Sequence, residues 1–237
     1  MAIRITSLKT SLNTEVDLRD YESCFVIDKR VEPYVTTRVY PSTTTAATQP
    51  ASAMTSNTAP SPYKAYASSR YSATYYPWKA FTKSVSTQGW ASASNNNGSM
   101  AWIALDLGEG NKLRDPKIGL WNRDNATVNG CNTAYVFGSN ELPVSGDGTT
   151  PTAMPSDAVL LGTFVGLDGS VRSNAYVLDC VGDETSNCTR GSSSQEIKNA
   201  QTKGFRYIIV ASDDWVYTSS ARYLVIGRIT IDGSFES

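Results

Sequence analysis

The chain has 237 residues, 40% of them hydrophobic, which suits one large β domain with a further segment, or two small domains. Its 21 Lys and Arg and 22 Asp and Glu give a net charge of −1, and the basic residues are scattered. Proteins that bind nucleic acid usually carry a basic stripe, so nucleic acid is not expected as a partner. The absence of histidine removes the Ser-His-Asp triad and the most common general base near neutral pH.

The N-terminal residues 1–41 carry mixed charges and two strand-like runs, Cys24–Ile27 and Val35–Tyr40. The stretch from Met1 to Lys9 lacks the apolar region of a secretory signal. No apolar run reaches the length of a membrane span. We predict that residues 1–41 form an N-terminal attachment arm.

Residues 42–62 are rich in Ser, Thr and Ala and carry no charge. This composition predicts an extended linker, which could reach roughly 65 Å at about 3.3 Å per residue. In one interpretation the segment docks on a neighbouring subunit. In the other it is a long surface strand packed on its own domain.

From Tyr63 onward the hydrophobic pattern has a period of two. Ile103 and Leu105 alternate with Trp102 and Ala104, which gives one apolar face and one mixed face. Turn-forming clusters separate such runs: Asn95-Asn96-Asn97-Gly98, Gly108-Glu109-Gly110-Asn111, Ser145-Gly146-Asp147-Gly148 and Leu167-Asp168-Gly169-Ser170. Short strands with this punctuation predict an all-β sandwich over residues 63–237.

Six landmarks follow one another along this region: Lys79-Ala80-Phe81, Gly89-Trp90, Trp102 to Gly108, Tyr135 to Asn140, Phe205 to Ile209 and Gly227 to Gly233. Their order and spacing resemble the discoidin family (coagulation factor 5/8 type C, galactose-binding-like). The resemblance implies an antiparallel jelly-roll β-sandwich with a buried tryptophan, here Trp90. It also implies that loops at one end bind surface sugars or lipids, and that the domain itself catalyses nothing.

Sugar-binding relatives in that family often hold a structural Ca²⁺ near an Ala-Phe-Asp-Gly turn. Here the matching residues are Ala80-Phe81-Thr82-Lys83, in which threonine replaces the carboxylate that a hard cation prefers and a lysine follows. We therefore expect no metal and no other cofactor.

The four cysteines form no CxxC pair, so a zinc ribbon is not expected. Cys180 and Cys188 flank a short polar segment and could close a small loop as a disulfide, which would imply an oxidising setting. The alternative is that Cys24, Cys131, Cys180 and Cys188 are all free thiols.

Four segments combine rings with amide, carboxylate or guanidinium groups, the mixture that typically recognises sugars. They are Tyr75-Tyr76-Pro77-Trp78, Asn95 to Gly98, Trp121 to Asn125 and Asp213 to Tyr217. Alternate loops of a jelly roll emerge at the same end, so some of these segments should converge. The candidate ligand-binding residues are Tyr76, Trp78, Asn96, Asn122, Arg123, Asp214, Trp215 and Tyr217.

Structural alternatives stand beside three of these candidates. Trp78 could instead close the end of the sandwich, Arg123 could be structural, and Trp215 could pack down into the core. By the resemblance, Tyr76 and Trp78 are the first choices for ligand contact.

The function that these features favour is non-enzymatic adhesion on the exterior of a virion. The protein would be a phage tail, baseplate, fibre or decoration component that binds host-surface carbohydrate, contacts other virion subunits through its arm and forms a homo-oligomer. The alternative is a free or enzyme-appended carbohydrate-binding lectin module, in an extracellular setting. A glycosidase needs only two facing carboxylates, so that activity is not formally excluded.

Overall fold

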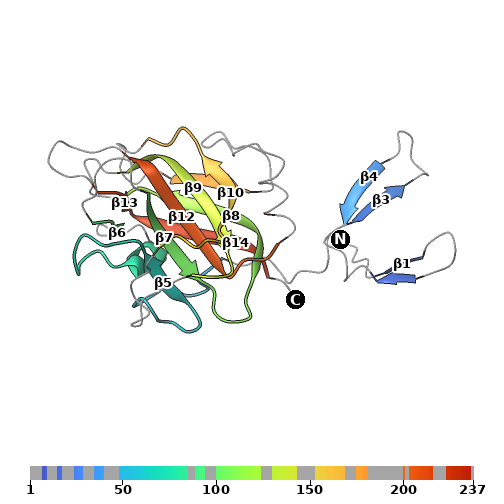
Figure 1. The fold of residues 1–237 in the computed structure, drawn as a ribbon, viewed down its shortest axis with the longest axis horizontal. Coiled ribbons are helices and arrows are strands. Elements are labelled where there is room, and N and C mark those ends of the chain that lie inside the picture. The colour runs from blue at the N-terminus through green and yellow to red at the C-terminus, as the bar shows by residue number, and fades with distance from the viewer. Residues whose placement is uncertain are drawn as a thin grey trace.

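The fold is an antiparallel β-sandwich preceded by two short hairpins (Figure 1). The computed structural model describes the backbone of residues 7–9, 15–17, 24–28 and 35–39. It further describes residues 48–84, 89–93, 100–123, 130–142, 153–168, 175–180, 200, 203–215 and 223–235. The expected all-β sandwich is confirmed.

The larger sheet has five antiparallel strands in the order β10-β9-β12-β7-β5. In Figure 1, β12 runs between β9 and β7 along the whole sandwich. The strands are β5 (Lys64–Ala67), β7 (Ala101–Asp106), β9 (Cys131–Ser139), β10 (Val159–Phe164) and β12 (Tyr207–Trp215).

The smaller sheet has three antiparallel strands in the order β11-β8-β14. A short ladder of two strands and one 3₁₀ helix complete the sandwich. These elements are β8 (Leu113–Trp121), β11 (Ala175–Asp179), β14 (Arg228–Phe235), β6 (Trp90–Ala91), β13 (Val225–Ile226) and η2 (Pro77–Phe81).

The main core lies between the two sheets. Ile103 and Leu105 of β7 face Ile118 and Leu120 of β8, and all four are at most 1% exposed. The period-two pattern therefore predicted the inward face of β7 correctly. Trp90 is fully buried, as expected, and its Nε1 donates a hydrogen bond to the Ser69 carbonyl oxygen at 2.9 Å.

The outer face of the five-stranded sheet is also buried, which the sequence pattern did not predict. A second apolar cluster forms there, with Leu142 and Met154 from the connection between β9 and β10 packed against it. Its buried members are Tyr66, Trp102, Ala104, Tyr207, Ile209 and Ala211. Burial raises the pKa of Tyr207 to about 12, and the nearby negative charge of Asp106 adds to this effect.

Asp106 closes one end of this second cluster through an ion pair with Arg206. Arg206 donates from Nε and Nη2 to the two carboxylate oxygens, at 2.7 and 2.9 Å. The Gly108 amide donates to the same carboxylate at 2.8 Å. Asp106 is 1% exposed, so this bidentate geometry provides the partners that a buried charge requires.

Residues 48–62 pack on the sandwich. The Gln49 amide donates to the Ile231 carbonyl oxygen of β14 at 2.6 Å, and Met54 is 1% exposed within the main core. The described part of this segment therefore packs on its own domain, as in the second of the two interpretations given for it. The folded body therefore includes residues from Thr48 onward.

The N-terminal region contains two antiparallel hairpins, β1 (Ser7–Lys9) with β2 (Glu15–Asp17), and β3 (Cys24–Asp28) with β4 (Val35–Val39). The second hairpin coincides with the two predicted strand-like runs. Each hairpin is a sheet of its own, paired with no described strand of the sandwich. Within the described ranges, no helix is both long and apolar enough to cross a membrane.

Replacing Met54 by alanine tests whether residues 48–62 belong to the folded body. Met54→Ala should lower the free energy of unfolding by about 2–5 kcal/mol, because it leaves a cavity in the core. Thr55→Ala, at the exposed neighbouring position, is the control and should change it by less than about 0.5 kcal/mol. Equal urea midpoints for the two variants would show that the segment is not part of the core.

Candidate functional site

The strand register gathers the predicted binding segments at one end of the sandwich, here called the loop pole. Ser212 pairs with Ala101, so β12 ends where β7 begins. Trp121 pairs with Arg228, so β8 ends where β14 begins. The connections after β5, β6, β8 and β12 therefore leave the sheets at this pole, and residues 75–78, 121–123 and 213–215 of the predicted segments belong to this end. The segment Asn95 to Gly98 lies outside the described residues.

Three tyrosine rings from two of these connections form the tyrosine cluster, which consists of Tyr71, Tyr75 and Tyr223. The Tyr71 ring meets Tyr75 edge-on, with ring centroids 5.8 Å apart, and lies 4.8 Å from the Tyr223 ring. The Tyr71 amide donates to the Ala91 carbonyl oxygen at 2.8 Å, which ties the backbone to β6. Tyr71 is nevertheless 53% exposed, so a fixed aromatic ring faces solvent.

Two arginines flank the cluster on the faces of consecutive rings. The Arg123 Cζ lies 5.6 Å from the centroid of Tyr75, and its Nη1 donates to the Tyr75 hydroxyl at 3.3 Å. The Arg70 Cζ lies 4.3 Å above the centroid of Tyr76. Such cation–π contacts hold each guanidinium in one orientation. The loop pole thus combines an exposed ring with two oriented guanidinium groups.

The two first-choice residues differ in accessibility and in contacts. Tyr76 is half-buried with Arg70 on its face. Trp78 is half-buried in η2, packs against the main core and accepts Lys79 on its ring at 5.7 Å. Tyr76 therefore belongs to the loop-pole group, whereas Trp78 also helps to close the sandwich.

Two of the candidate residues are buried and offer little surface to a ligand. Trp215 is 3% exposed in the main core, so its ring packs down as the alternative interpretation supposed. Asn122 is 5% exposed, and its Nδ2 donates to the Asp168 carbonyl oxygen at 2.9 Å. Both side chains are thus buried here and contribute to the shape of the loop pole, and their contact with a ligand stays a prediction.

Asp214 is exposed at the end of β12 and bound to the start of β9. Its carboxylate accepts hydrogen bonds from the side chains of Asn132 and Thr133, each at 3.2 Å. The neighbouring Tyr135 has a raised pKa, because of its burial and then the negative charge of Asp213. Asp214 remains a candidate for ligand contact on this side of the pole.

Asn96, Tyr217 and Cys188 lie outside the described residues, so the predictions made for them stay predictions. Cys131 and Cys180 have buried side chains. The proposed Cys180–Cys188 disulfide therefore also remains a prediction.

Sequence reasoning missed Arg70, Tyr71 and Tyr223 as members of the site. Four aromatic residues between positions 71 and 78, preceded by an arginine, were the available signal. Tyr76 and Trp78 in the later half of this stretch were the first choices because of the resemblance to the discoidin family. Tyr223 precedes β13 and reaches the cluster from a distant part of the sequence.

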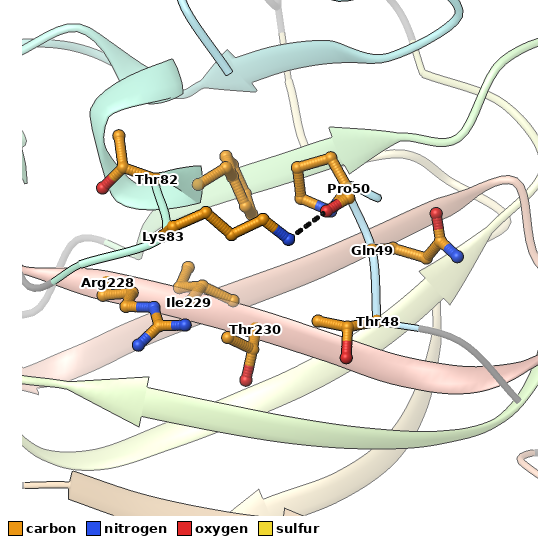
Figure 2. A pocket seen from close by; sticks show the side chains of 9 residues that line it. Thr48, Gln49, Pro50, Thr82, Lys83, Arg228, Ile229 and Thr230 are labelled. Atoms are coloured by element: carbon orange, nitrogen blue, oxygen red, sulfur yellow. Dashed lines mark hydrogen bonds between the residues drawn. The ribbon is translucent and has the colours of Figure 1, made fainter. Parts of the chain in front are cut away.

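The residues around Thr82 and Lys83 do not fit a divalent cation. A small hollow, open to solvent, lies there between β14 and residues 48–50 (Figure 2). Figure 2 shows the Lys83 side chain pointing toward Pro50, where Nζ donates to the carbonyl oxygen at 3.4 Å. Among the described residues no carboxylate lines the hollow, and Arg228 adds a second cation to its wall. No group of three potential metal ligands occurs in the part of the chain described.

Comparison with known proteins gives matches among solved structures only; no family model and no curated protein matches. CpGH89CBM32-5 from Clostridium perfringens, in complex with GalNAc-beta-1,3-galactose, is 12% identical with a TM-score of 0.44, covering 71% of this chain and 94% of its own. CBM62 from Clostridium thermocellum Xyl5A is 17% identical with a TM-score of 0.43, covering 78% and 98%. The family 32 CBM from C. perfringens NanJ, in complex with galactose, is 11% identical with a TM-score of 0.38, covering 72% and 93%. What these modules bind is a property of those proteins, and the ligand of this chain has to be inferred from its own residues.

Proposed function

We propose that the protein binds carbohydrate at the loop pole, without catalysing a reaction on it. The observation that carries this proposal is the Tyr71 ring, 53% exposed and held between Tyr75 and Tyr223. A pyranose has an apolar face that can stack on such a ring, while its hydroxyls need oriented polar partners. Arg123 supplies a guanidinium donor on Tyr75, the ring that contacts Tyr71, and Arg70 supplies another on the adjacent Tyr76.

The cluster is arranged before any ligand arrives. Tyr71 is fixed by two ring contacts and a backbone hydrogen bond to β6, and Arg123 is fixed by Tyr75. Side chains that are already ordered lose little conformational entropy on binding, so more of the contact free energy appears as affinity. This supports a recognition role for the loop pole.

We further propose that residues 1–41 attach the protein to a multisubunit assembly, for which we favour the exterior of a bacteriophage virion. The strands of the two N-terminal hairpins are only three and five residues long. An isolated two-stranded hairpin is at best marginally stable in water, because it buries little apolar surface. A partner surface would supply the missing burial, and other subunits, including further copies of this chain, are the partners we propose. A free or enzyme-appended lectin module is the alternative.

Replacing the exposed ring tests carbohydrate binding. On a glycan array followed by calorimetry with the glycans that bind, Tyr71→Ala should weaken affinity at least tenfold, about 1.4 kcal/mol, because the stacking surface is lost. Tyr71→Phe keeps the ring and should stay within about threefold of the unmodified protein. Thr55→Ala, on residues 48–62, is the control for surface change. Unaltered affinity in Tyr71→Ala would contradict the proposed site, and turnover of any glycan would contradict the non-catalytic role.

Light scattering tests the attachment arm. The full chain should form a homo-oligomer, or a larger assembly with its native partners, and a chain that starts at Thr48 should be a monomer with the same sandwich circular dichroism. The physical reason is that the hairpins need a partner to bury them. A full chain that is monomeric in its native source would sink the assembly proposal and favour the free lectin module.

A further inference from the structure

The guanidinium groups at the loop pole lie on aromatic faces and have no carboxylate partner among the described residues. Arg70 lies on Tyr76, and Arg123 lies on Tyr75. Arg228 repeats the arrangement at the start of β14, with its Cζ 4.8 Å from the centroid of Trp121. Arg228 lines the hollow beside Lys83, so Arg70 and Arg123 are the guanidinium groups associated with the rings that follow β5.

At the opposite end of the sandwich, an arginine with a structural role is paired with a carboxylate. Arg206 also lies on a ring, with its Cζ 5.0 Å from the centroid of Tyr207, but Nε and Nη2 on one edge of its guanidinium donate to the two oxygens of the Asp106 carboxylate. With 22 acidic residues against 21 basic ones, the chain has enough carboxylates to do the same elsewhere. The carboxylate of Asp214, at the end of β12, accepts hydrogen bonds from the side chains of Asn132 and Thr133 and not from one of these arginines.

The unused donors of these arginines add a second observation. The Nε atoms of Arg123 and Arg228 are buried and have no hydrogen-bond partner within the described part of the chain. Arg123 gives one of its five N–H groups to the Tyr75 hydroxyl, and the Arg70 side chain is exposed. A partly desolvated guanidinium without a counter-charge is costly, and an anion offers it charge-assisted, bidentate hydrogen bonds.

From this arrangement we infer that the saccharide recognised at the loop pole is anionic and presents a carboxylate or a sulfate ester to Arg123 and Arg70 while its ring stacks on Tyr71. The inference rests on the proposed carbohydrate-binding function and names the chemical class of its ligand. A neutral sugar would use the guanidinium donors but would leave their charge uncompensated. The shared chemistry of carboxylate and sulfate is a planar or trigonal set of oxygens that matches the guanidinium fork.

Matched pairs of probes separate the effect of the negative charge on affinity from the effect of the rest of the sugar. One pair is a trigalacturonic acid and its carboxyl-reduced trigalactose; a second is trimannuronic acid and its carboxyl-reduced trimannose. A third pair is a sulfated galactan oligosaccharide and its desulfated form. Affinity of the full chain for each is measured by calorimetry at about 50 mM and about 500 mM NaCl, where the Debye length falls from above about 10 Å to below it.

At least one anionic probe should bind tenfold or more tightly than its neutral partner at low salt, and this preference should shrink at high salt. Arg123→Gln and Arg70→Gln should each reduce the preference several-fold and affect neutral sugars less. Lys112→Gln removes the same charge from an exposed residue between β7 and β8, at the opposite end, and should leave the preference unchanged. If Arg123→Gln unfolds, Arg70→Gln decides, because its exposed side chain contributes little to the core.

The outcomes separate the inference from the function on which it rests. Neutral and anionic partners that bind equally, in a manner that depends on Tyr71, would overturn the anionic preference and leave carbohydrate binding standing. A preference that survives in both arginine variants would overturn the assignment to Arg70 and Arg123. Failure of every probe, together with an array on which no glycan binds, would overturn the proposed function and the inference with it.

Discussion

The structure depends on the register of its antiparallel strands. Ser212 opposite Ala101, Trp215 opposite Cys131 and Arg228 opposite Trp121 bring the ends of both sheets to one pole. The period of a strand is two, so a slip by one residue would turn the core face of β7 toward the outside and carry the loops with it. The shared core of both sheets fixes this register, and the loop pole is a consequence of it.

Aromatic rings occupy three different positions at the loop pole, which explains how one end of a sandwich can be closed and still present a ring to solvent. Trp90 and Trp215 fill the core, Trp78 and Trp121 lie half-buried at its margin, and Tyr71 faces solvent. The rings at the margin and around Tyr71 then hold guanidinium groups on their faces. An arginine placed in this way keeps its charge near the surface with no partner among the carboxylates that the structure describes, unlike Arg206, whose charge is compensated by Asp106.

The local sequence pattern predicted features that depend on residues close together in the sequence. It did not predict contacts between segments that are far apart in the sequence. The alternation around Ile103, the buried Trp90 and the runs that become β3 and β4 followed from spacing and residue type. The burial of Trp215 did not, because it depends on packing within the main core. The Asp106–Arg206 pair joins residues 100 positions apart, and Tyr71 meets Tyr223 across an even longer separation. Such contacts leave no periodic signal, so the candidate segments could be named but not their exposed members.

Mapping a bound saccharide by backbone amide chemical shifts is the most direct measurement of the central claim. During titration with a glycan that binds, the account predicts that shifts concentrate at residues 70–76, Arg123 and Tyr223, with the core strands unchanged. Shifts concentrated instead at the hollow between residues 48–50 and Lys83, or on the outer face of the five-stranded sheet, would contradict it.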